Sequence, residues 1–256
     1  MKLKAALLSL LVMAMVFVSY GKAQAIEADV SAGVDVLSNY VWRGQNLVND
    51  SGVLQPTLDI ALKNGLGFNY WSNNSMNNGE TTETDLTLTY SRDYGKLSTT
   101  TGYIHYGLDS APDTEEIFVA LSYDTFLSPS ITVYQDIDEG DGQFVIFAIG
   151  HSIDIGNFYG KDVALNLGAS AGYNFSDGAS MGTNAKGKEF NDFYAGELTA
   201  SLTIPVTSNI TIEPKIAYTG ELSDDADEAI SALNVGYGTG RDTEVLYGGV
   251  NISMNF

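Results

Sequence analysis

Three acidic runs are the residues of this sequence whose types could bind a ligand directly. They are Asp109, Asp113, Glu115 and Glu116; Asp136, Asp138, Glu139 and Asp141; and Glu221, Asp224, Asp225, Asp227 and Glu228. Carboxylate oxygens are the ligands that Ca²⁺ and Mg²⁺ prefer. The run that begins at Asp136 is similar to the start of an EF-hand loop, but its third ligand and its glycine are out of register. We therefore interpret the runs as solvated loops, with bound divalent cations as the less favoured alternative.

Histidine is the other residue type that could do chemistry, and the chain has two, His105 and His151. Neither stands in a Ser–His pattern, and no G-x-S-x-G, H-E-x-x-H or phosphate-binding loop motif occurs. The absence of Cys excludes disulfides and thiolate metal sites. A formal charge of −20 excludes a general nucleic-acid binder, because phosphate binding needs a basic surface. We expect no enzymatic activity, no catalytic residue, no cofactor, no metal site and no nucleic-acid partner.

The first 25 residues have the pattern of a secretory signal peptide. Lys2 and Lys4 form a positive start, residues 7–18 are apolar, and Ala23-Gln24-Ala25 is a small-residue cleavage site. The apolar part is too short to cross a bilayer as a helix, which leaves a retained membrane anchor as the weaker alternative. We predict that residues 1–25 are removed and that residues 26–256 form one domain.

From residue 28 onward, apolar and polar side chains alternate with a period of two, as they do in β-strands. The alternation predicts strands near residues 28–43, 52–63, 65–74, 83–93, 97–108, 115–126, 129–137, 143–154, 162–174, 192–204, 209–219 and 244–256. No long stretch has clear helical periodicity. Pro56 and Pro214 fall inside predicted strands, and since Pro has no N–H to donate we expect them to mark bulges or strand ends.

The connections between these strands alternate between brief turns and long polar loops. Asn64-Gly65 is a typical hairpin turn, whereas residues 44–51, 75–82, 109–114, 138–142, 175–191 and 220–243 form the longer connections. Short turns at one end and long loops at the other are typical of outer-membrane barrels. We therefore predict an all-β fold: a closed, up-and-down antiparallel transmembrane β-barrel of about twelve strands with short periplasmic turns and long extracellular loops.

A soluble β-sandwich would show the same alternation, so other features must separate the two folds. The predicted strands are long enough to cross a bilayer when tilted. Aromatic residues near their ends, including Tyr40 and Trp42, suit an interfacial girdle, and Phe256 continues an apolar face. These features favour the membrane barrel over a soluble secreted β protein.

The polar faces of the strands are then assigned to the barrel interior. The candidate channel-lining residues are Asp35, Asn39, Arg43, Asp59, Lys63, Asp85, Glu197, Glu213 and Lys215. Acidic side chains outnumber basic ones there, which would favour cations over anions. Trp42 would face lipid, and Arg43 would point inward and pair with Asp35 or Asp59, or bind an anionic solute; the structural ion pair is the favoured alternative. His105 shares a predicted interior face with Thr101 and Tyr103, whereas His151 cannot be assigned a direction.

Residues 39–44 (Asn-Tyr-Val-Trp-Arg-Gly), Gln55-Pro56 and residues 68–72 (Phe-Asn-Tyr-Trp-Ser) resemble the TorF-type porin family of Gram-negative bacteria. The resemblance is sharpest in this first third of the chain. It implies an outer-membrane, channel-like protein whose solute is undefined, and it supplies no catalytic residues.

We therefore expect a cell outer-membrane, porin-like channel for passive passage of small solutes, with a preference for cations. Its partners would be outer-membrane lipid and lipopolysaccharide and small solutes, with divalent cations at the acidic loops as the less favoured alternative. The alternative is a non-conducting barrel whose acidic loops bind surface ligands or partners. The sequence leaves open the solute, the oligomeric state and whether residues 220–243 fold into the lumen as a plug.

Overall fold

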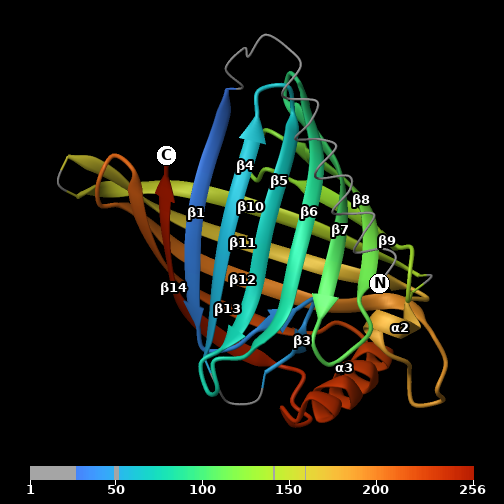
Figure 1. Ribbon diagram of the computed structural model, residues 1–256. Helices are drawn as coiled ribbons and strands as arrows, with labels where there is room; N and C mark the ends of the chain where they lie inside the picture. The colour runs from blue at the N-terminus through green and yellow to red at the C-terminus, as the bar shows by residue number, and fades with distance from the viewer. Residues whose placement is uncertain (1–26, 49–51, 141, 159) are drawn as a thin grey trace, which may run out of the picture.

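The computed structural model describes residues 27–48, 52–140, 142–158 and 160–256. The predicted signal peptide lies outside these residues. Within them, twelve antiparallel strands close into a barrel (Figure 1). In chain order they are β1 (Ala28–Leu37), β4 (Val53–Leu62), β5 (Leu66–Ser75), β6 (Thr81–Tyr94), β7 (Leu97–Leu108), β8 (Thr114–Tyr123), β9 (Ser130–Asp136), β10 (Gln143–Phe158), β11 (Lys161–Phe175), β12 (Asn191–Pro205), β13 (Ile210–Glu221) and β14 (Val245–Asn255).

Each of these strands pairs with its neighbours in the chain, and β14 closes the barrel by pairing with β1. This confirms the predicted closed, up-and-down antiparallel barrel. Figure 1 places the short connections at the upper end, which we call the turn end. The lower end, which we call the loop end, carries the long connections with helices α2 (Gly178–Met181) and α3 (Asp224–Tyr237).

The first strand is shorter than the sequence predicts. β1 ends at Leu37 instead of residue 43, because the chain leaves the barrel wall at Ser38. The following residues form a separate two-stranded hairpin, β2 (Val41–Trp42) and β3 (Gln45–Asn46). The other predicted strands each overlap one observed strand.

The two prolines lie within strands, which corrects the prediction that they mark bulges or strand ends. Pro56 is in register with Val34 of β1, and Pro214 is in register with Val250 of β14. On the other side of each strand, the pairing is interrupted around the proline and resumes in the same register. A missing N–H therefore removes ladder hydrogen bonds on one side without displacing the strand.

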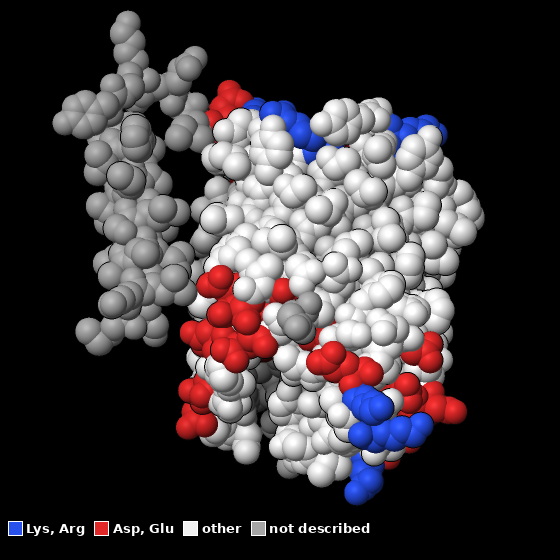
Figure 2. Space-filling view, turned by 90° about the vertical axis from the view of Figure 1, so that its right-hand side faces the viewer, with Lys and Arg blue, Asp and Glu red and all other residues white. Residues whose placement is uncertain are grey.

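The outer face of the barrel is apolar over a broad band. Leu88, Leu198 and Leu246 point outward and are 52%, 61% and 66% exposed. Figure 2 shows a belt without charged side chains on this face, with charged side chains toward both ends of the barrel. Contiguous exposed apolar surface of this extent is typical of a lipid-facing barrel. In the described residues, no helix is long and apolar enough to cross a membrane.

Candidate functional site

Residues 38–48 fold into the barrel interior, and we call this segment the inner loop. It leaves β1 and carries the β2–β3 hairpin toward the far wall of the barrel. Its tip reaches Glu116 of β8 and Phe144 of β10, strands that lie about half-way round the barrel from β1. The inner loop therefore divides the interior instead of extending the wall.

A tight turn at Arg43-Gly44 aims the hairpin. Trp42 pairs with Gln45, so Arg43 and Gly44 are the two turn residues, with φ values of 51° and 90°. Two successive positive φ values are those of a type I′ hairpin turn. A side chain at position 44 would place its Cβ 2.3 Å from the Cβ of Ala195 on β12. Glycine is therefore required both for the backbone conformation and for the close contact with the wall.

Arg43 anchors the inner loop to the wall. Its two terminal nitrogens each donate to one oxygen of Glu116 at 2.8 Å. The two side chains are only 5% and 2% exposed. The guanidinium carbon also lies 4.4 Å from the ring centres of Trp42 and Tyr134. Tyr106 completes the arrangement by donating its hydroxyl to Glu116 at 2.8 Å. This bidentate, aromatic-lined geometry suits arginine and not lysine.

Burial and nearby charges set the pKa values of the inner loop. Burial alone would lower the pKa of Arg43, but the Glu116 carboxylate outweighs it and holds the pKa above its ordinary value. Burial raises the pKa of Tyr40 well above its ordinary value, and the neighbouring Glu83 carboxyl raises it further. The inner loop thus places a charged guanidinium and a neutral phenol inside the barrel.

The long connections at the loop end also form hydrogen bonds with the inner loop. Gln45 is fully buried and donates to the backbone oxygen of Ser180 in α2 at 2.9 Å. The N–H of Asn46 donates to the side chain of Asn234 in α3 at 3.0 Å, and the Thr239 hydroxyl donates to the Asn46 carbonyl. Residues 220–243, whose position the sequence left open, therefore lie at the loop end in contact with the inner loop.

Helix α3 has capping features that the alternating pattern of the rest of the chain obscured. The Ser223 side chain accepts from the N–H of Ala226, and Gly238 ends the helix in a left-handed conformation. Its buried residues are Ala226, Ala229, Ile230 and Asn234, at helical spacing. Ala226, Ala229 and Ile230 pack with Phe144, Met181, Phe190, Tyr194 and Ala195 in one hydrophobic cluster. This cluster seals the loop end around the hairpin.

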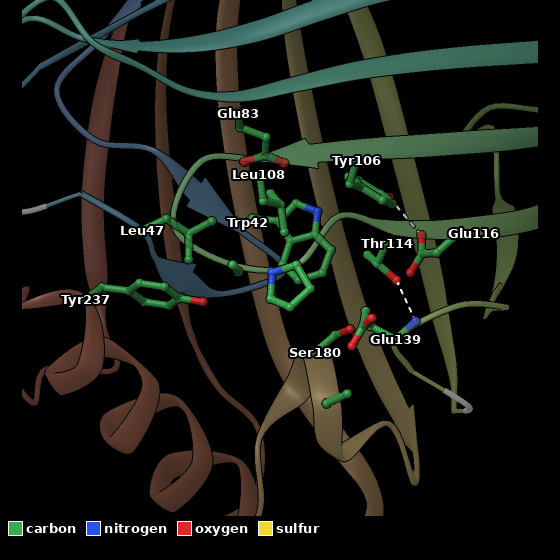
Figure 3. Close-up of a pocket in the computed structure, with 13 residues that line it drawn as sticks. Trp42, Leu47, Glu83, Tyr106, Leu108, Thr114, Glu116, Glu139, Ser180 and Tyr237 are labelled. Atoms are coloured by element: carbon green, nitrogen blue, oxygen red, sulfur yellow. Dashed lines mark hydrogen bonds between the residues drawn. The ribbon is translucent and has the colours of Figure 1, made fainter. Parts of the chain in front are cut away.

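Two cavities lie on opposite sides of the inner loop. The outer cavity, at the loop end, measures about 250 Å³, and its lining includes Glu83, Tyr237 and Glu139. The inner cavity measures about 340 Å³, and its lining includes Arg43 and Glu197. Trp42 and Tyr106 line both cavities, and their rings meet edge to face at 6.2 Å. In Figure 3, the Trp42 side chain lies at the centre of the residues that line the outer cavity. A partition one side chain thick thus separates the two spaces.

Asp35 and Lys215, both predicted to line the interior, form an ion pair. Lys215 of β13 reaches across β14 to Asp35 of β1 at 2.8 Å, and Asn251 of β14 donates to the same carboxylate at 3.1 Å. Asp59 accepts from the Asn69 amide at 2.7 Å. The register thus brings Asp35 and Lys215 together on the inner face of β1, β13 and β14, whereas Asp59 pairs with Asn69 of β5.

Glu197 and Glu213 have neutral hydroxyl partners, whereas Asp85 lies beside another carboxyl group. Glu197 accepts from the Tyr247 hydroxyl at 2.6 Å, and Glu213 accepts from the Thr203 hydroxyl at 3.0 Å. Asp85 is in register with Tyr106 and in hydrogen-bonding contact with the Glu83 carboxyl. One Asp85 oxygen is buried without a hydrogen-bond partner.

Lys63 and Asn39 are not part of this interior network. Lys63 lies in the turn after β4 and pairs with Glu27, and both side chains are about two-thirds exposed, at 66% and 65%. Asn39 is half-buried in the inner loop, between β1 and β2. Lys63 thus lies at the turn end of the barrel, and Asn39 lies at the start of the inner loop.

Two expectations about side-chain direction and one about an ion-pair partner are wrong. Tyr40 and Trp42 do not face lipid, because β1 has already ended and the inner loop carries both rings inside the barrel. Arg43 pairs with Glu116 instead of Asp35 or Asp59. His105 faces outward with Thr101 and Tyr103, since Tyr106 beside it points inward to Glu116 and neighbours alternate.

His105 and the acidic runs also have local partners. The His105 nitrogens lie 3.7 Å from Glu115 and 4.0 Å from Asp113. Asp136, the first residue of the EF-hand-like run, accepts from the backbone N–H groups of Asp138 and Gly140, each at 2.9 Å. That carboxylate holds its own loop together.

Glu116, Tyr106 and Gln45 are site residues that the sequence did not single out. Glu116 was grouped with an acidic loop run, yet it is 1% exposed inside the barrel. The alternation could have indicated that Glu116 faces inward, since Glu116 is in phase with Phe118 on the inner face of β8. The pairing with Arg43, 73 residues away, has no local signal.

Comparisons with known proteins support the fold. A family described as "Bacterial protein of unknown function (Gcw_chp)" matches residues 22–139. The solved structure of the NanC porin is similar, with 16% identity, a TM-score of 0.52, and coverage of 90% of this chain and 99% of that one. The KdgM porin, solved in complex with disordered oligogalacturonate, has 9% identity, a TM-score of 0.53, and coverage of 89% and 99%. No curated protein matches the sequence. The fold is therefore a porin-like barrel.

Proposed function

We propose that the protein is an outer-membrane channel, similar to the TorF-type porins, through which small solutes pass passively with a preference for cations. The apolar belt and the closed barrel support a position in a bilayer, because a closed barrel leaves no unpaired strand edge in lipid. The predicted signal peptide at residues 1–25 supports export to the outer membrane.

The proposed preference for cations rests on the balance of charge inside the barrel. Among the described residues, two cations lie inside, and both are paired: Arg43 with Glu116 and Lys215 with Asp35. Asp59, Glu197 and Glu213 face inward with neutral hydrogen-bond partners and are left uncompensated, whereas Glu83 and Asp85 hydrogen-bond each other. An interior lined by one sign of uncompensated charge concentrates the opposite ion.

The inner loop restricts the size of the solute. A path through the barrel has to connect the outer and inner cavities past Trp42 and Tyr106, which line both. Side chains that fill a barrel lumen narrow or close it. The same observation favours a second candidate function, a non-conducting barrel whose loop end binds ligands.

Planar-bilayer recording separates the two functions. We expect discrete conductance steps from the purified protein, and in a KCl gradient a reversal potential that shows K⁺ preference. Glu213→Gln should reduce that preference, whereas Glu115→Gln should leave it unchanged, because Glu115 faces outward beside His105. Persistent silence from folded protein would reject the channel and favour the ligand-binding barrel.

A further inference from the structure

The outer cavity has the position of a small-molecule site, and its size suits a small ligand. At about 250 Å³ it lies just below the usual range of ligand pockets, roughly 300–1,000 Å³. Its wall combines the inner loop (Trp42, Leu47), strand β6 (Glu83) and helix α3 (Tyr237). Figure 3 shows these side chains directed toward a common space, with Glu83 and Glu139 on opposite sides of Trp42. Segments far apart in the chain thus converge on one pocket.

The charge of this pocket is negative. Glu83, Glu116 and Glu139 line it, and its lining includes no Lys or Arg. Arg43 neutralises Glu116 from the side of the inner cavity. Glu83 is only 7% exposed, and its nearest polar neighbours are the Tyr40 hydroxyl and the Asp85 carboxyl. A buried carboxyl group beside another carboxyl group gains from any cation that reaches it.

Aromatic rings supply the rest of the recognition surface. Trp42, Tyr106 and Tyr237 line the pocket, and Leu47 and Leu108 add apolar surface. Aromatic faces attract cations as well as apolar groups, and the stacking of Arg43 on Trp42 at 4.4 Å is an example within this protein. A ligand that carries both a positive charge and a short hydrocarbon chain fits this combination.

We propose that the outer cavity binds small organic cations, with a protonated amine held at Glu83 and the hydrocarbon part against Trp42 and Tyr237. The site deepens the proposed channel function by naming a class of solute. An anion of the same size would meet carboxyl groups and no Lys or Arg in the lining, and a neutral alcohol would gain no ion pair. The amine is therefore the discriminating group.

Tryptophan fluorescence provides a direct test, because the chain contains two Trp residues, Trp42 and Trp71. Trp71 packs on Tyr40 and does not line the outer cavity. In a Trp71→Phe background, Trp42 is the sole fluorophore. Folded protein in detergent is titrated with n-butylamine at neutral pH, and with butyrate and n-butanol as isosteric anionic and neutral probes. We expect a saturable fluorescence change with butylamine alone.

Variants locate the binding group. Glu83→Gln should weaken butylamine binding by about 10- to 100-fold, the loss expected when a charged hydrogen-bond partner becomes neutral. Tyr237→Ala removes a wall residue on α3 without altering the barrel strands, and it should also weaken binding. Glu115→Gln, an outward-facing change, is the matched control and should bind as the parent does. Retained heat-modifiable mobility on gels establishes that each variant is folded.

The outcomes separate this site from the channel. An equal response to n-butanol, an unsaturable response, or undiminished binding in folded Glu83→Gln and Tyr237→Ala would overturn the proposed site. Conductance without butylamine binding would overturn the site and leave the channel intact. Butylamine binding without conductance would support the site and reject the channel.

Discussion

Replacing Glu116 with Gln should release the inner loop from the barrel wall. The substitution preserves size and one hydrogen-bonding oxygen but removes the charge that Arg43 faces at 2.8 Å. Because the two side chains are 5% and 2% exposed, water cannot replace the lost carboxylate while the loop stays in place. Leaving one charge of a buried pair uncompensated costs about 3–5 kcal/mol. The ratio of seated to released loop should therefore fall by about two to four powers of ten.

Limited digestion with trypsin measures this release directly, because trypsin cleaves after Arg43 only when the peptide becomes accessible. We expect the native protein to resist cleavage at Arg43-Gly44 and Glu116→Gln to be cut there, with a matching rise in single-channel conductance. The double variant Arg43→Met/Glu116→Gln removes both charges and also the trypsin site at position 43, so conductance is its readout. We expect it to recover much of the native conductance.

Glu115→Gln is the control for charge removal on the same strand, since Glu115 faces outward beside His105. If Glu116→Gln remains as resistant to trypsin as the native protein, and its conductance is unchanged, the Arg43–Glu116 pair does not hold the inner loop. A double variant no closer to the native protein than the single variant would refute the role assigned to the buried charge.

Three further substitutions test separate parts of the structure. Gly44→Ala should expose the inner loop to trypsin, because the added Cβ would lie 2.3 Å from the Cβ of Ala195. Gly79→Ala is the control, since Gly79 also has a positive φ, of 75°, but no neighbour within 4 Å of an added Cβ. Equal digestion of the two variants would contradict the role of the contact with Ala195. Ser223→Ala should lower the free energy of unfolding of α3 by about 1 kcal/mol, measured by local hydrogen exchange, and unchanged exchange there would disprove the cap. Lys215→Met should increase cation selectivity, because it leaves Asp35 unpaired, and a reversal potential that moves toward the anion would count against the interior charge balance.

The barrel itself could be predicted from the sequence because its cause is local. A residue's face in a strand depends only on parity, so apolar side chains at every second position mark most of the strands. Turn chemistry such as Asn64-Gly65 then fixes which segments are hairpin partners. Closure follows because no strand edge can remain open in lipid.

The inner loop could not be predicted from the same pattern. Tyr40 and Trp42 continue the alternation of β1, and an aromatic ring is equally apolar whether lipid or the barrel interior surrounds it. The departure at Ser38 and the partner of Arg43 depend on contacts with strands distant in the chain. Helix α3 was missed because its buried face consists of small or polar residues, Ala226, Ala229 and Asn234 among them, within an acidic run.

The pairing of β1 with β14 has a consequence for how the chain is assembled. Residues 31–37 and 249–255 form the seam, so the contacts that seal the cylinder join segments more than two hundred residues apart. Such non-local pairing makes folding slow. The earliest strand must keep one edge bare until the final one has been synthesised, and an exposed strand edge of this kind is prone to aggregation.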